Sequence, residues 1–490
     1  MAGRRRWAVA PGVAVAVAFL LMLGAGSASA AVDVRVVGQP ALFPQFNPAV
    51  SDYVARCRPG APLRLSIAAP RGVTVAVDRR AGRGGSFKVA LRVASGQAIR
   101  FAVKTGNRRR RYLIRCLPPD FPAWSAERTG QPEAAWYVVA PCCTKSTYVA
   151  IFDTLGVPVW WINTHRPPLD ASLLPDGDIV WAQQHGKDLG PGVSAGVYEE
   201  HGLDGKLRRT FSIPNGAPTD RHELQLLPNG DYVVVGYKPR RGVDLSPYGG
   251  PANATVLDAL VEEITPQRKV AWSWNSKDHI GLAETGRWYQ QHVIPAPAKL
   301  NGKPAYDIVH INAVEPYGPS RFLVSLRHTD AIYAIDKLSG GVLWKLGGTQ
   351  TSRSLQIVGD DVPDFGGQHD IRVLPDGTIT LHDNGTGLGR APRALRFGID
   401  AAAGTATLLE QITDPEATDS PCCGSARKLP GGHWVISWGG IHLVTEVNAT
   451  GKRVFALHFA VHMSYRAFPV LPGRLRRSAL HRGMDAMHPR

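Results

Sequence analysis

The sequence has no long block of acidic or basic residues, and only 20% of its 490 residues are charged. With 44% hydrophobic residues, this composition is typical of an ordered globular protein rather than a disordered chain. After the first thirty residues no apolar run reaches transmembrane length, which excludes a later membrane span. Glycine (52) and proline (38) are abundant, which indicates many tight turns between short strands. A chain of this length buries a large core and exceeds one ordinary domain, although a repeat fold can use it as one.

The formal net charge is +16, with positive charge at both ends of the sequence. The ordinary interpretation is a solvated cationic surface, and the functional one is attraction of anionic substrates or of an anionic cell-envelope polymer. Nucleic acid is not an expected partner, because the chain carries an export signal. Part of the charge lies in an N-terminal cluster and a C-terminal basic tail: Arg4, Arg5, Arg6, Arg474, Arg476, Arg477, Arg482 and Arg490.

Residues 1–30 have the three parts of a secretory signal peptide. The arginine cluster is followed by an apolar segment, 13–23, and by the small-residue cleavage site Ala28-Ser29-Ala30. We therefore expect a mature chain that begins near Ala31 and is soluble outside the cytoplasmic membrane. The adjacent arginines leave a twin-arginine route open beside the general secretory one.

Six cysteines in an exported chain favour disulfides. Cys57 and Cys116 bracket the first β-rich segment, and we expect them to pair. The other four lie in two adjacent pairs, which form either two vicinal disulfides or cross-links between the pairs. A zinc site built from the four thiols is a less favoured alternative. These residues are Cys142, Cys143, Cys422 and Cys423.

The segment 31–118 alternates apolar and polar residues between turn signals, which predicts a small N-terminal β-sandwich. Within it, Arg108 to Arg111 is interpreted as a basic hairpin tip, either a solvated turn or an anchor to anionic polymer. Residues 119–134, rich in proline and polar residues, are interpreted as a linker. The strands expected in the sandwich include 63–67, 73–77, 87–93 and 99–103.

From residue 135 onward the sequence is repetitive. An apolar strand, a polar turn and a second apolar strand recur six times at blade-like spacing, and strand–turn–strand motifs with proline or glycine lie between them. Six units of four strands predict an all-β fold, a six-bladed β-propeller over 135–470, with a strand near 465–468 completing the first blade. Residues 471–490 are interpreted as a basic tail. The repeated segments are 148–160, 197–205, 260–272, 332–344, 395–407 and 443–455.

Three histidines, His222, His310 and His369, each lie five residues before one of these turns. Because the first strand of each blade lines the channel, we expect the imidazoles to converge there. One histidine on a strand is usually structural, but three at one repeat offset favour a site. Arg327, on the strand after the His310 turn, joins the candidate site, and His328 should face away from it by strand alternation.

Three imidazoles are able to bind zinc, but a neighbouring guanidinium repels a dication. Three histidines with an arginine instead suit an anionic tetrahedral group, which the planar fork of arginine and imidazolium donors both bind. Histidine is also a possible nucleophile. Glu223 and Asp370 neighbour two of the histidines and should face the other way, which argues against a metal-dependent hydrolase.

The propeller half of the chain resembles the bacterial arylsulfotransferase family, the PAPS-independent aryl sulfate sulfotransferases. The β-rich segment before it is similar to the N-terminal sandwich of that family. The resemblance covers roughly 140–470 and is carried by 221–230, 307–314, 323–336 with 344–348, and 368–370 with 382–385.

The resemblance implies a ping-pong mechanism without a cofactor or metal, acting on small-molecule aryl sulfates and phenols. His369 would attack the sulfur, and His222, His310 and Arg327 would bind the sulfuryl oxygens. The cysteine pairs and the basic tail do not match the family pattern. Gly424, at the His369 offset in the last blade, predicts that Cys422 and Cys423 lie near the channel.

Two alternatives stand beside this interpretation. One is a non-catalytic propeller that binds sulfated or other anionic glycan through the same cationic channel. The other is a metal-dependent propeller hydrolase. Replacing the nucleophile distinguishes the transferase from both alternatives. In a transferase this change should abolish transfer while ligand binding is retained.

Overall fold

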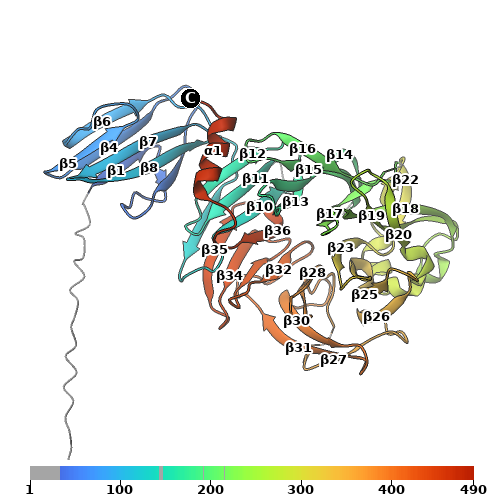
Figure 1. Cartoon of the computed structure of the whole chain (residues 1–490). Helices are drawn as coiled ribbons and strands as arrows, with labels where there is room; N and C mark the ends of the chain where they lie inside the picture. The colour runs from blue at the N-terminus through green and yellow to red at the C-terminus, as the bar shows by residue number, and fades with distance from the viewer. Residues whose placement is uncertain (1–33, 143–146, 191–192, 215, 363) are drawn as a thin grey trace, which may run out of the picture.

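The computed structural model describes residues 34–490 apart from 143–146, 191–192, 215 and 363. Within these residues the protein is all-β, with one α-helix near the C-terminus (Figure 1). The predicted signal peptide lies outside the described residues, as does Cys143. In the described part, no helix is both long and apolar enough to cross a membrane.

The first eight strands form two sheets. They are β1 (Arg35–Gln39), β2 (Leu42–Phe43), β3 (Asp52–Arg56), β4 (Leu63–Ala69), β5 (Val73–Val77), β6 (Gly85–Leu91), β7 (Ala98–Thr105) and β8 (Arg108–Leu117). One sheet has the order β1-β4-β6 and the other β2-β3-β8-β7-β5. Alternate side chains of β4, β5 and β6 are buried, and both sheets contribute to one apolar core, because each strand turns its apolar side inward. Arg108 to Arg111, expected at a hairpin tip, are exposed residues of β8 paired with β7.

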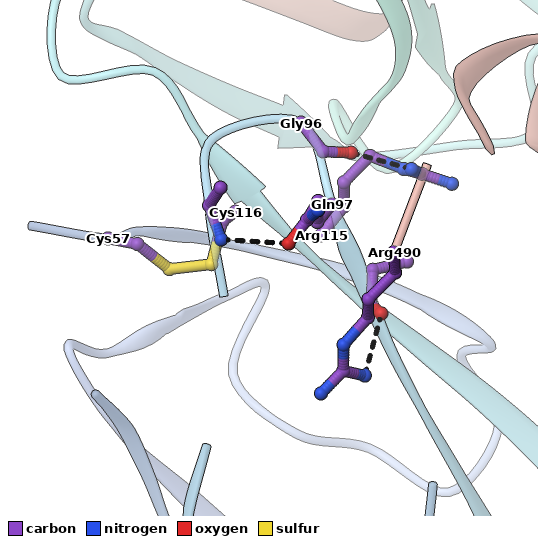
Figure 2. Close-up of a disulfide and its surroundings, with 8 residues drawn as sticks. Cys57, Gly96, Gln97, Arg115, Cys116 and Arg490 are labelled. Atoms are coloured by element: carbon purple, nitrogen blue, oxygen red, sulfur yellow. Dashed lines mark hydrogen bonds between the residues drawn. A yellow bond between two sulfur atoms is a disulfide. The ribbon is translucent and has the colours of Figure 1, made fainter. Parts of the chain in front are cut away.

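The predicted bridge between Cys57 and Cys116 is present (Figure 2). It joins the residue after β3 to β8, the strand that pairs with β3 in parallel. The N–H of Cys116 donates to the carbonyl of Gln97, and the guanidinium of Arg115 donates to the carbonyl of Gly96 at 2.7 Å. The bridge therefore fastens the end of β3 inside the N-terminal core.

The rest of the chain forms five further sheets. The first has the order β12-β11-β10-β36, and the next is a ten-stranded sheet built from β13–β16, β17–β20, β21 and β22. The bounds are β10 (Trp136–Cys142), β11 (Tyr148–Asp153), β12 (Pro158–Asn163), β36 (Met463–Val470), β13 (Pro168–Leu173), β14 (Ile179–Gly190), β15 (Val193–His201), β16 (Leu207–Phe211), β17 (Thr219–Leu226), β18 (Tyr232–Val243), β19 (Ala254–Ile264), β20 (Val270–Asn275), β21 (Ala298–Leu300) and β22 (Lys303–Asp307).

The last three sheets have the orders β23-β24-β25-β26, β27-β31-β30-β29-β28 and β32-β33-β34-β35-β9. Short helical turns η1 to η5 lie in the connections. The bounds are η1 (Ser246–Tyr248), η2 (Ser276–Asp278), η3 (Leu282–Thr285), η4 (Tyr289–Val293), β23 (Ile311–Pro316), β24 (Arg321–Leu326), η5 (Arg327–Thr329), β25 (Ala331–Asp336), β26 (Val342–Gly347), β27 (Gln356–Val358), β28 (His369–Val373), β29 (Ile379–Asp383), β30 (Arg393–Asp400), β31 (Thr405–Ile412), β32 (Ser425–Lys428), β33 (Trp434–Ser437), β34 (Leu443–Val447), β35 (Arg453–Phe459) and β9 (Trp124–Arg128).

Six strands from these five sheets lie around a common centre. Contacts run from β36 to β13, then to β17, β23, β28 and β32, and from β32 back to β36 (Figure 1). The predicted C-terminal strand is confirmed, because β36 pairs with β10 and completes the first of these sheets. This arrangement brings residues from distant parts of the sequence to one place.

The two segments that flank the expected propeller differ from their predicted structure. The expected linker 119–134 contains β9, which pairs with β35 as an outer edge strand. The expected basic tail 471–490 contains the helix α1 (Arg477–Met487), in which Arg477 binds Asp52 and Asp153. Neither was visible from composition, because both segments are ordered by partners far away in the sequence.

Candidate active site

The three predicted histidines lie together. His222 is in β17, His310 directly precedes β23, and His369 begins β28. The ring centres of His222 and His310 are 5.1 Å apart. The ring of Tyr465, from β36, lies 5.4 Å from His222 and 6.2 Å from His369. All three histidines are buried, so the repeat offset did predict which residues meet.

Irregular backbone at the start of these strands directs the side chains. The pairing register shifts beside each histidine, in β17, β23 and β28. His310 has a φ of +47° and Asp370, next to His369, a φ of +57°. Bulges of this kind change the direction of a side chain. Non-glycine residues at positive φ are strained, and such strain is concentrated at functional sites.

Two of the histidines are held by carboxylates. Asp220 binds Nδ1 of His222, and Asp307 lies 2.5 Å from Nδ1 of His310. Burial raises the pKa of Asp307 to about 7, while burial and the nearby His222 hold the pKa of His310 well below its usual range. Burial therefore favours the neutral form of each member of this pair.

His369 has a different environment. Its Nδ1 lies 2.8 Å from the carbonyl of Gly367 and 2.9 Å from Oδ1 of Asn384, two acceptors, so Nδ1 carries the proton. Nε2 accepts a hydrogen bond from the backbone N–H of Cys423 at 3.2 Å. Burial, with the charge of Arg327, lowers the pKa of His369 well below its usual range. His369 is thus a neutral imidazole whose Nε2 is unprotonated and accepts the Cys423 N–H.

Arg327 is a buried cation without a carboxylate partner among the described residues. Its guanidinium stacks 4.2 Å from the ring centre of Trp288 and donates to the carbonyl of Pro421 at 2.8 Å and to Nε2 of His328 at 2.9 Å. Its Nε has no partner in the described part of the chain. A buried guanidinium without a carboxylate partner favours an anion in the site, which fits an oxyanion ligand.

The position of Arg327 corrects one expectation. It was expected on a strand, with His328 facing the other way, but β24 ends at Leu326 and a 3-10 turn follows, closed by Asp330 at φ +50°. In that turn Arg327 and His328 are hydrogen-bonded neighbours. The alternation rule failed because it applies only while the strand continues.

The side chains of the candidate site are poorly suited to binding a metal ion. Ligand atoms of Asp307, His310 and His328 lie within 4.8 Å of one another. Both nitrogens of His328 are used, by the carbonyl of Asp307 at 2.7 Å and by Arg327. A guanidinium donating into the cluster opposes a dication, so these residues suit an anion better.

The carboxylates of Glu223 and Asp370 bind arginines. Arg372 and Arg466 donate to Glu223, and Arg427 donates twice to Asp370 at 2.7 Å. Burial raises the pKa of Glu223 to about 7, whereas Arg372 and Arg427 outweigh burial and lower the pKa of Asp370 to about 2. These groups form a buried ion network rather than a ligand set for the histidines.

Several site residues were not predicted from the sequence. Asn384 lies in the segment 382–385 that carried the family resemblance, so a signal existed for it. Asp220 and Asp307 are close in sequence to their histidines but do not share one offset. Trp288 comes from a segment without any repeat signal, and Tyr465 lies in the predicted strand near 465–468 but was not predicted as a site residue. The Cys422-Cys423 segment, expected near the channel, contacts His369 through the N–H of Cys423.

The chain is only distantly similar to solved structures. A search of curated proteins gives no match. The chain is similar to a solved protein of unknown function from Bacteroides caccae at 12% identity, which covers 69% of this chain and 99% of that one with a TM-score of 0.42. It is also similar to an inactive variant of virginiamycin B lyase from Staphylococcus aureus with quinupristin, at 9% identity, 70% and 89% coverage and a TM-score of 0.34.

The sequence comparison with protein families is more specific. The family model described as arylsulfotransferase (ASST) matches residues 204–460, more than half of the chain. The matched region contains His222, His310, Arg327 and His369. The chain therefore belongs to the arylsulfotransferase (ASST) family.

Proposed function

We propose that this protein is an exported aryl sulfotransferase that moves a sulfuryl group from an aryl sulfate to a phenol through a sulfohistidine at His369. Membership of the family supports sulfuryl transfer in general. The observation that carries the finer proposal is that one buried site holds a neutral His369 and Arg327, a cation without a carboxylate partner among the described residues. A nucleophile and an oxyanion clamp in one buried site are what transfer of a charged sulfuryl group requires.

The architecture proposed for this function is a six-bladed β-propeller behind a small N-terminal β-sandwich. The cycle of contacts through β36, β13, β17, β23, β28 and β32 supports six blades around one channel. The shared core of β1 to β8 supports the sandwich. We further propose cleavage of residues 1–30 and release outside the cytoplasmic membrane, or association with the cell envelope.

In the first half-reaction, Nε2 of His369 attacks the sulfur of the aryl sulfate. The N–S bond forms as the S–O bond to the aryl group breaks, and the phenolate leaves. Arg327, His222 and His310 bind the sulfuryl oxygens, whose charge shifts during transfer. The Nδ1 proton stays on His369, directed at Gly367 and Asn384, and stabilises the charge that attack creates on the ring.

In the second half-reaction, a phenol oxygen attacks the same sulfur and releases His369. A phenol has a pKa of about 10, so loss of its proton to a base assists the attack. The candidate acceptor is the carboxylate of Asp307, which is bonded to Nδ1 of His310 and whose pKa burial raises to about 7. Exchange between two phenols is close to thermoneutral, so no nucleotide donor is needed.

Exchange kinetics test this proposal. Release of nitrophenol from 4-nitrophenyl sulfate should depend on a phenol acceptor and follow ping-pong kinetics. His369→Asn should abolish release while inorganic sulfate still binds, because the variant keeps Arg327. If H369N retains turnover, or if the wild type binds anionic glycan and never releases nitrophenol, the proposal is wrong.

A further inference from the structure

The loop before β32 carries two adjacent cysteines whose sulfur atoms almost touch. The Sγ atoms of Cys422 and Cys423 are 2.8 Å apart. Cys423 has a φ of +67°, a conformation uncommon for a residue with a side chain. Strain of this kind points to a loop with a role.

The same loop contacts the candidate site at three points. The N–H of Cys423 donates to Nε2 of His369 at 3.2 Å, and its carbonyl accepts from Asn384 at 2.8 Å. The carbonyl of Pro421 accepts from Arg327 at 2.8 Å. A change in the bonding of the two sulfurs therefore acts directly on the groups around the nucleophile.

We propose that Cys422 and Cys423 form a vicinal disulfide in the oxidised protein, and that this bond holds the loop in the position that supports catalysis. The second part rests on the proposed function, whereas the first does not. A disulfide has an S–S distance of about 2.0 Å, so closure requires an approach of less than about 1 Å and leaves the loop near its present position.

Such a bond is expected to be easy to reduce. The Cα atoms of adjacent residues are about 3.8 Å apart, whereas ordinary disulfides span about 4.4–6.8 Å. Strained bridges of this kind are the labile and regulatory ones. The contact with Cys423, together with Arg327, lowers the pKa of the Cys422 thiol against the effect of burial, which favours the reactive thiolate.

Formation of the bond requires a disulfide as oxidant, such as oxidised glutathione or an oxidised thiol oxidoreductase. The Cys422 thiolate attacks one sulfur of the oxidant and expels a first thiolate. Cys423 then attacks Cys422 and expels the second. Two electrons pass to the oxidant, and the two protons end on the released thiols.

The bond contributes to transfer by fixing the Cys423 N–H. This N–H faces Nε2 of His369, and it would donate to a sulfuryl oxygen once sulfur is bound there. A donor fixed in advance is worth more than a mobile one. Reduction should therefore lower turnover by about tenfold, less than complete loss of such a donor.

Peptide mapping tests the bond. Protein equilibrated with oxidised glutathione is alkylated and digested with trypsin, which leaves both cysteines in the peptide 397–427 and the other pair in 129–145. We expect peptide 397–427 to be unalkylated and lighter than the dithiol by two hydrogen atoms. Two alkylated thiols, or a cross-link to 129–145, would overturn the proposal.

Turnover tests the effect of the bond. The wild type should lose about tenfold on reduction and recover on reoxidation. Cys422→Ser should have the turnover of the reduced wild type, and adding reductant should not change it. Because this variant keeps Cys57–Cys116, it also controls for reduction of that bridge. If the disulfide forms but the oxidised and reduced proteins have equal turnover, the bond does not position the loop for catalysis and this part of the proposal is wrong. Absence of turnover in every state refutes the proposed function but leaves the mapping result intact.

Discussion

Oδ1 of Asn384 lies 2.9 Å from Nδ1 of His369. The amide nitrogen of Asn384 donates to Oγ of Ser420 at 2.7 Å and to the carbonyl of Cys423 at 2.8 Å, so the orientation of the amide is fixed. An amide oxygen accepts only, which holds the imidazole proton on Nδ1. The contact therefore leaves Nε2 as the unprotonated nitrogen of His369, the one that attacks sulfur in the proposed mechanism.

Replacing this amide should impair the nucleophile without removing it. Asn384→Ala should lower kcat by about tenfold to a hundredfold with little change in KM, because the carbonyl of Gly367 still accepts from Nδ1. The isosteric Asn384→Asp should raise the pKa of His369 and move the acid limb of the pH–rate profile to higher pH. Unchanged profiles in both variants would contradict the assigned role.

Arg327 should contribute to the transition state more than to substrate binding. Arg327→Met removes the cation and should lower kcat/KM by about a hundredfold to a thousandfold, and Arg327→Lys should recover only part of this. Because Arg327 lowers the pKa of His369, R327M should also move the acid limb upward. Arg321→Met is the matched control, since Arg321 begins β24 and stacks on Tyr317 outside the site. Equal losses in both variants would indicate a general folding defect.

Stability should fall as the solution becomes acidic. His382 is buried, its two ring nitrogens have no partner among the described residues, and burial lowers its pKa to about 4. The unfolded chain binds a proton near pH 6.5, so the folded state binds fewer protons between about pH 6.5 and 4. Stability from the neutral ring is therefore present above that window and is lost as pH falls through it.

The variant His382→Leu isolates this effect. Between pH 7.5 and 5, the free energy of unfolding of the wild type should fall by about 2 kcal/mol more than that of H382L. Urea unfolding at the two pH values measures the difference. Parallel losses in the two proteins would show that His382 is not responsible.

The helix α1 should fasten the N-terminal sheets to the rest of the protein. Arg477 lies 2.8 Å from Asp52 and 3.2 Å from Asp153, and both carboxylates are buried. Arg477→Met should lower stability by about 1–3 kcal/mol, because it leaves buried carboxylates without this partner. Calorimetry should show a lower Tm with turnover unchanged, and the exposed Arg476→Met should show neither effect. A normal Tm in R477M would refute the fastening role.

The sequence predicted the features that repeat and missed several that depend on local backbone or on distant segments. His222, His310 and His369 were found because one offset recurs on strands that meet at the centre. The 3-10 turn at Arg327 and the positive φ at His310 depend on local backbone that periodicity does not report. Tyr465 and Trp288 reach the site only through pairing and packing of distant segments. The edge strand β9 was hidden because a short strand gains its stability from its neighbour β35.

The central claim is that sulfur is bound covalently to His369 between the two half-reactions. The direct measurement is the mass of the intact protein after mixing with 4-nitrophenyl sulfate without acceptor, followed by peptide mapping under conditions that preserve N–S bonds. A sulfohistidine intermediate predicts one sulfuryl adduct on the peptide that contains His369, released when a phenol is added and absent in H369N. Nitrophenol release with no adduct, or an adduct on another residue, would contradict it.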